Sequence, residues 1–220
     1  MVFLFGINLP GYQGLPGHLW QQTVCWTFIL LAGFSWQLSR FHWKRGLWLL
    51  LGGGLITWVT WLFLPSQYVC FGVLTFLGSC TLLWIALDPM LHKISPFGGM
   101  IGCFALFVAS TLLTRNRFFL PEPFSHSFLM NSFLAWLGFP QPGFTSSDYF
   151  PLLPWAFLFG VGYFLYSALQ HRGLLEKLLA RGKIPVVSLM GRHSLLVYLL
   201  HQPICYGLCL AVLPLVGLAR

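Results

Sequence analysis

Six long apolar runs, nearly free of charge, decide what this chain can fold into. A helix needs roughly 20 apolar residues to cross the hydrocarbon core of a bilayer, and runs of about this length recur along the whole sequence. We therefore expect six membrane-spanning helices, over residues 19–38, 46–64, 69–87, 97–113, 151–169 and 186–215. The opening MVFLFGIN is apolar but too short to span, and we expect it to be the last turns of a truncated first helix.

The scarcity of charged residues excludes a water-soluble fold. Only 7% of the 220 residues are charged and 57% are hydrophobic, whereas a soluble domain is typically about 25% charged. We expect an all-α, polytopic bundle that forms a single transmembrane domain over residues 1–220, with the lipid bilayer as its partner. The net charge of +8 does not indicate nucleic-acid binding, because the basic residues stand in short clusters between apolar runs.

The distribution of Lys and Arg predicts the orientation, because basic residues concentrate in cytoplasmic loops. Alternate loops carry eight of them on one side against three on the other, and Arg192 falls inside a span. The cytoplasmic loops are then those with Arg40, Lys44, Arg45, Lys93 and residues 172–183. His18 and the loop 114–150 face outward, and the apolar middle of that loop, SFLMNSFLAWLGF, is expected to form an interfacial helix or a lid. The predicted location is the bacterial inner membrane, as a multi-pass protein.

The six cysteines all lie within apolar runs, and no two of them form a CxxC pair. Free cysteines in such positions behave as small hydrophobic residues. A metal site needs clustered ligands, and the sequence shows no such cluster. We therefore expect buried free thiols and no metal.

The last apolar run carries polar residues at membrane depth, in the stretch GRHSLLVYLLHQP. Ionisable groups inside a bilayer are costly, so they face the interior of a bundle or a water-filled cavity and indicate function. His193 and His201 fall on roughly one side of a helix, about 12 Å apart along its axis. Pro203 is expected to kink the helix just beyond His201.

Several segments together carry a family resemblance: TFILLAGFSWQLSR with a basic KRG turn, ITWVTWLFLPSQYVCFGVLTFLGSC, and PGFTSSDYFPLLPW followed by LMGRHSLLVYLLHQP. From about residue 2 to 210 the chain resembles bacterial membrane proteins similar to the catalytic domain of heparan-alpha-glucosaminide N-acetyltransferase. The resemblance implies transfer of an acetyl group from acetyl-CoA to an envelope sugar or amino sugar. It also implies a catalytic histidine in the outer loop after the family's first helix, matched by His18 across a gap in the alignment. The motif histidine of the family's last helix is matched directly by His201. The family's usual first helix, with its acidic residue and LRG-like turn, has no counterpart here.

These residue types suit acetyl transfer. Histidine can act near neutral pH as the base or as a nucleophile. Asp148 either lines the outer rim of the site, where it orients an imidazole or binds an amino group, or caps the helix that starts near residue 151. The residues expected to bind acetyl-CoA or stabilise the oxyanion are Arg192, His193, Tyr198 and Gln202.

Simpler interpretations apply to the other histidines. His42, His92 and His171 lie in basic loops and are expected to be solvated, and His126 is expected at the surface.

Two other functions stay open from the residues alone. One is a transporter or flippase of a small or lipid-linked molecule, and the other is a non-catalytic subunit that completes its bundle with a partner chain. Assembly as a homo-oligomer also stays open.

The predicted orientation can be tested by labelling. A single cysteine placed at position 126 or 141, in a chain cleared of its own cysteines, should react with a membrane-impermeant maleimide in intact cells, because loop 114–150 is expected outside. A cysteine at position 177 should react only after lysis. Labelling at 126 and 141 only after lysis would contradict the orientation.

Overall fold

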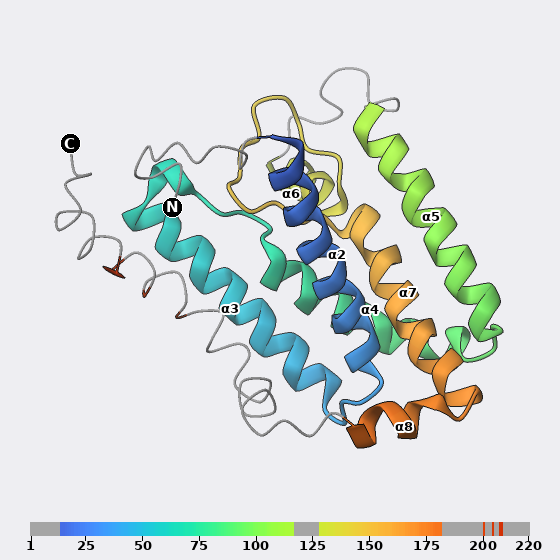
Figure 1. Cartoon of the computed structure of the whole chain (residues 1–220). Helices are drawn as coiled ribbons and strands as arrows, with labels where there is room; N and C mark the ends of the chain where they lie inside the picture. The colour runs from blue at the N-terminus through green and yellow to red at the C-terminus, as the bar shows by residue number, and fades with distance from the viewer. Residues whose placement is uncertain (1–13, 117–127, 182–199, 201–203, 205–206, 209–220) are drawn as a thin grey trace. The chain divides into compact units, whose positions relative to one another are not determined.

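The structure is a computed structural model that describes residues 14–116, 128–181, 200, 204 and 207–208. Within these ranges it has seven α-helices, one short 3₁₀ helix and no strand (Figure 1). The helices are α2 (Leu15–Trp36), α3 (His42–Phe63), α4 (Val73–Leu91), α5 (Pro96–Asn116), α6 (Phe128–Leu137), α7 (Leu152–His171) and α8 (Leu174–Arg181). The expected all-helical class is therefore confirmed for the described residues.

Four of these helices, α3, α4, α5 and α7, are long and apolar enough to cross a membrane. They match the second to fifth of the six expected spans within a few residues. The helix α2 covers the first expected span but falls outside this group, because Gln21 and Gln22 lower the hydropathy of its first half. The sixth expected span, 186–215, lies almost entirely outside the described residues, as do residues 1–8.

Local signals explain where several helices begin and end. Ser95 caps α5, because its Oγ accepts the N–H of Gly98 at 3.3 Å, and Pro96 occupies the first helical position, where its missing N–H costs nothing. Gly173 follows α7 with a φ of 63°, the left-handed conformation that commonly ends a helix. The helix α6 lies where the apolar stretch of the outer loop predicted one.

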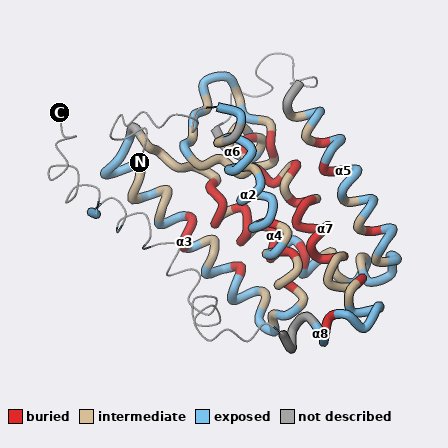
Figure 2. Tube along the Cα trace, in the orientation of Figure 1, coloured by how far each residue is buried: buried red, intermediate tan, exposed pale blue. Residues whose placement is uncertain are grey.

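The chain divides into two compact units, and each is described by itself. Thr23–Leu175 holds most of α2 and all of α3 to α7, whereas Met1–Gln22 and Glu176–Arg220 form the other. Within Thr23–Leu175, α5 packs along α7 and α3 packs along α4. Figure 2 shows that the buried residues concentrate on α4 and α7, at the centre of this unit. We call the end with the basic turns 37–41 and 92–95 the inner end, and the end with residues 64–72 the outer end.

Glycines let α2 and α7 approach until their backbones touch. A Cβ at Gly33 would collide with the carbonyl oxygen of Phe159, and a Cβ at Gly162 would collide with the carbonyl oxygen of Leu30. Small residues at helix contacts allow this close approach in membranes, where association depends on van der Waals packing and hydrogen bonds between helices. The contact fixes the position of α2 in the unit.

A methyl group at either glycine should therefore destabilise the protein. We expect Gly33→Ala and Gly162→Ala to lower the free energy of unfolding by at least the roughly 1–3 kcal/mol typical of overpacking, because backbone cannot move aside as a side chain does. Thermal unfolding of purified protein in detergent measures this. Gly102→Ala is the matched control, since a Cβ there meets no atom within 4 Å. Equal melting temperatures for all three variants would contradict the packing.

Candidate functional site

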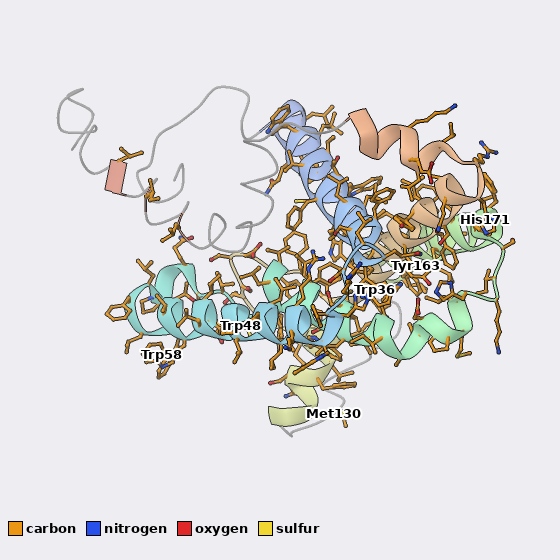
Figure 3. All side chains as sticks on the ribbon, turned by 90° about the horizontal axis from the view of Figure 1, so that it is seen from below. Trp36, Trp48, Trp58, Met130, Tyr163 and His171 are labelled. Atoms are coloured by element: carbon orange, nitrogen blue, oxygen red, sulfur yellow. The ribbon has the colours of Figure 1, made fainter. Side chains whose placement is uncertain are left out.

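A polar cavity of about 260 Å³ lies at the inner end of the Thr23–Leu175 unit. It is lined by residues from the end of α2, the start of α3 and the end of α4: Trp36, Gln37, His42, Ile85, Asp88 and His92. We call it the inner cavity. Figure 3 labels Trp36 and Tyr163, which lie together among the helices with ring centroids 5.7 Å apart. Polar groups gathered inside an apolar bundle indicate function by default.

The turn between α2 and α3 forms one wall of this cavity. The Ser39 N–H donates to the carbonyl of Trp36 at 3.1 Å, so the chain reverses within five residues. His42 thereby stacks on Trp36, with centroids 4.0 Å apart and planes 15° from parallel. Trp36 is 5% exposed, and its Nε1 donates to the carbonyl of Thr81 in α4 at 3.2 Å. The stacked pair is therefore fixed to α4.

His42 brings an unsatisfied polar atom to this wall. Its Nδ1 is buried and has no hydrogen-bond partner. A buried polar atom without a partner costs roughly 1–3 kcal/mol, so each one calls for an explanation; Nε1 of Trp84, outside this cavity, is the other such side-chain atom in the described part of the chain. The expectation that His42 is a solvated loop residue is corrected here, because the tight turn carries it into the bundle.

Asp88 forms the polar centre of the opposite wall. Its Oδ1 accepts the hydroxyl of Tyr163 at 2.6 Å and lies 3.3 Å from Nε2 of His92. The Asp88 side chain is 28% exposed and that of His92 is 61% exposed, so the imidazole is the more accessible of the two. In a neutral imidazole, donation from Nε2 leaves Nδ1 as an acceptor, and a carboxylate that orients an imidazole is the usual arrangement of a general base.

Pro89 changes the hydrogen bonding of α4 at this point. Proline has no N–H, so the carbonyl four residues earlier receives no helical hydrogen bond from it. That carbonyl belongs to Ile85, which lines the cavity. The sequence thus places an acid and a freed carbonyl on the same wall.

Basic residues surround the inner end. Lys44 Nζ lies 5.4 Å from the ring centroid of Phe41, and the Arg172 guanidinium lies 4.5 Å from that of Phe97. Cations gathered at one end of a bundle raise the local concentration of anions there. The inner end is therefore suited to an anionic ligand.

Asp148 lies at the outer end and caps a helix that is distant in sequence. Its Oδ2 accepts the N–H of Val73, the first residue of α4, at 3.2 Å. A Cβ at Gly72 would lie 2.9 Å from the same oxygen, so glycine makes room for the carboxylate. The helix that follows Asp148, α7, has Pro151 at its N-cap and no side-chain cap. The alternative that Asp148 caps the helix that follows it is therefore wrong.

Residues around Asp148 join the two outer loops. Ser146 Oγ receives the N–H of Cys70 at 2.9 Å and donates to the Cys70 carbonyl at 2.9 Å. The Ser147 and Phe150 N–H groups donate to the carbonyls of Tyr68 and Phe71, each at 2.9 Å. We call residues 68–73 with residues 146–150 the outer clamp. It holds the start of α4 against the segment that leads into α7.

The other residues expected in the site stand apart from these two groups. His18 lies in the first turn of α2 with an exposed side chain, and its N–H donates to the carbonyl of Gly14 at 3.2 Å. It belongs to the unit that holds Met1–Gln22, whereas Asp148 belongs to Thr23–Leu175. Arg192, His193, Tyr198, His201 and Gln202 lie outside the described residues. The expected meeting of His18, Asp148 and His201 in one cavity stays a prediction.

No three His, Cys, Asp or Glu side chains gather as metal ligands in the part of the chain that the structure describes. Sequence reasoning missed the inner cavity, although one signal for it was available. Asp88 is the single acid within the four spans and stands four residues before His92. This is the spacing that places two side chains together on a helix.

Burial and hydrogen bonding at Asp148 predict a dependence of stability on pH. Burial raises the pKa of this carboxyl, and the Val73 N–H opposes part of the rise. The folded protein then binds the proton more tightly than the unfolded chain, whose Asp pKa is about 3.9. The stability that this proton contributes is fully present below the pKa of the unfolded chain. It is lost as pH rises through the pKa of Asp148 in the folded protein.

We expect the melting temperature to fall less from pH 4 to pH 7 in Asp148→Asn than in the parent, because the amide keeps an acceptor for Val73 and carries no charge. Asp148→Ala should lower the free energy of unfolding by about 0.5–2 kcal/mol, as the loss of other helix caps does. Thermal unfolding in detergent across this range measures both. The exposed Glu176 supplies the control Glu176→Gln. Parallel curves for the parent and Asp148→Asn would show that Asp148 does not titrate as argued.

Comparison with known families identifies the chain. Residues 4–203 match the family described as "Heparan-alpha-glucosaminide N-acetyltransferase, catalytic". Comparisons with curated proteins and with solved structures gave no match. Since the match spans most of the sequence and four helices suit a membrane, this membrane protein belongs to the heparan-alpha-glucosaminide N-acetyltransferase catalytic family.

Proposed function

We propose that the chain is a membrane-embedded acetyltransferase that moves an acetyl group from acetyl-CoA to an envelope sugar or amino sugar. The observation that carries the proposal is the inner cavity, which is lined by Gln37, His42, Asp88 and His92 in a member of an acetyltransferase family. Acetyl-CoA is anionic and cytoplasmic, and the charge distribution predicts that the inner end faces the cytoplasm.

The residues of the inner cavity fit part of acetyl-CoA. Its volume of about 260 Å³ is below the roughly 300–1,000 Å³ of a site for a whole drug-sized ligand, so it suits one portion of the donor. The unpartnered Nδ1 of His42 can hydrogen-bond to a polar group there. Arg172 and Lys44 stand at the same end to neutralise phosphates. Acetyl-CoA supplies an acetyl group activated as a thioester.

Residues on the α4 wall of the inner cavity position a proton. The Tyr163 hydroxyl fixes the carboxylate of Asp88, and the carboxylate in turn orients His92. His92 can then hold a proton on Nε2 while its Nδ1 accepts one from a bound group. This arrangement supports binding and orientation of the donor at the inner face.

Transfer to the acceptor is proposed for the outer face. The acceptor's amine or hydroxyl forms a bond to the acetyl carbonyl carbon, the carbon–sulfur bond breaks, and CoA leaves as the thiol. His201 or His18 acts as the base that takes the proton of the acceptor, or as a nucleophile that carries the acetyl group from CoA to the acceptor. Arg192, His193, Tyr198 and Gln202 bind the donor's acetyl end or stabilise the oxyanion. The bond between Asp148 and Val73 supports a positioning role for Asp148 at the outer rim.

The proposal is tested by turnover. Purified protein in lipid nanodiscs should release free CoA thiol from acetyl-CoA when an amino-sugar acceptor is present. His201→Ala should lower kcat by about 10²- to 10⁴-fold, as expected for loss of a general base, while His126→Ala should not. A transporter or a non-catalytic subunit would release no thiol. Activity of His201→Ala within threefold of the parent would make His201 structural.

A second experiment tests whether the inner cavity binds acetyl-CoA. His92→Ala should raise KM for acetyl-CoA by roughly tenfold or more, since a hydrogen bond to a charged group contributes about 1.5–3 kcal/mol. His92 is mostly exposed, so its loss should leave the fold intact. His171→Ala, at the exposed end of α7, is the control. An unchanged KM would remove the inner cavity from donor binding.

A further inference from the structure

A second hollow, of about 530 Å³, lies beside α3 and shares no residue with the inner cavity. Its wall on α3 is one helical stripe, formed by Leu50, Gly54, Thr57, Trp58 and Trp61. We call it the α3 groove. A Cβ at Gly54 would meet no atom within 4 Å, so this glycine leaves the middle of the groove open.

The groove has the length of one leaflet of a bilayer. From Leu50 to Trp61 the stripe covers about 16 Å at 1.5 Å per residue, and the hydrocarbon core of a bilayer is roughly 30 Å thick. The stripe occupies the outer half of α3, which runs from His42 to Phe63. Trp58, Trp61 and Tyr68 stand toward its outer end, where aromatic residues collect at the level of the headgroups.

The walls of the groove offer few free polar groups. The Thr57 hydroxyl donates to the carbonyl of Gly53 at 3.1 Å within its own helix. Burial, together with a side-chain hydrogen bond to Cys70, raises the pKa of Tyr68 to about 12, so the phenol is uncharged near neutral pH. The Cys70 N–H is bound to Ser146. Such a surface suits hydrocarbon rather than a sugar or a nucleotide.

The outer end of the groove is continuous with the outer clamp. Tyr68, Cys70 and Phe71 line the groove, and their backbone groups bind residues 146–150. A chain lying in the groove would therefore leave its headgroup beside the clamp and the carboxyl of Asp148. This is the face at which the acceptor is proposed to react.

We propose that the α3 groove holds the hydrocarbon chain of a lipid that carries the acceptor sugar. The inference rests on the proposed function for the identity of the headgroup, whereas binding of the chain stands on the groove alone. The acceptor is then a lipid-linked sugar presented at the outer face, with its tail along α3 and its reacting group at the outer clamp.

Binding can be measured without activity. Delipidated protein in detergent is titrated with a polyprenyl phosphate, and separately with phosphatidylethanolamine, and bound lipid is counted by native mass spectrometry. We expect one polyprenyl chain per protein, bound more tightly than the phospholipid. Gly54→Leu should weaken this binding about tenfold or more, because the new side chain displaces methylene groups from the groove. Gly102→Leu, another span glycine with open space around it, should not.

Three outcomes would overturn the proposal. Equal binding by Gly54→Leu and Gly102→Leu would show that the chain lies elsewhere. Equal binding of phosphatidylethanolamine would make the groove a site for bulk lipid. A fall in melting temperature of Gly54→Leu alone, in lipid-free detergent, would show that protein already fills the groove, from residues 182–220 or from a second copy.

The link to the acceptor is tested with the transfer assay. Acetyl transfer to a lipid-linked amino sugar should exceed transfer to the same sugar without its lipid, and Gly54→Leu should lower this ratio while Gly102→Leu keeps it. Equal rates on both acceptors would overturn the link. Transfer to neither acceptor would contradict the proposed function instead, and the binding experiment would still decide the occupant of the groove.

Discussion

The rest of the structure depends on backbone-to-backbone contact between α2 and α7. Lipid surrounds the bundle with hydrocarbon, so burial of apolar side chains does little to hold helices together there. Gly33 and Gly162 replace that driving force with close packing. The approach also brings Gln37 within reach of α7, where its Nε2 donates to the Tyr163 carbonyl and to Ser167 Oγ at 3.2 and 2.8 Å. Together with the hydrogen bond from Trp36 to Thr81, this contact holds the α2 side of the inner cavity in place.

Four of the six expected spans could be predicted from the sequence, because apolar length alone marks α3, α4, α5 and α7. The expected ranges 97–113 and 151–169 correspond to Pro96–Asn116 and Leu152–His171. The inner cavity could not be predicted in the same way. It forms where the ends of three helices meet, and hydropathy carries no information about which loop residues turn inward. His42 therefore looked solvated, although the turn places its ring on Trp36.

Asp148 shows the same limit in a smaller case. Sequence proximity offered a cap on the helix that follows it as one of two alternatives, whereas the structure pairs it with Val73, 75 residues earlier. The loops 68–73 and 146–150 meet because α4 and α7 are neighbours. This contact depends on helix packing and cannot be read from the local sequence. The polar group of the last apolar run, with His201 at its centre, lies outside the described residues, so that part of the predicted site stays a prediction.

The helix α4 makes hydrogen bonds to neighbouring segments at both the outer and the inner end of the bundle. The first residue of α4 is bound by Asp148, and its last turn presents Asp88 to Tyr163. The 19 residues between Val73 and Leu91 span about 28 Å as a single helix. A shift of α4 along its axis by one residue, about 1.5 Å, would stretch both hydrogen bonds at once. The hydrogen bonds at the two ends of α4 therefore resist the same displacement of the helix.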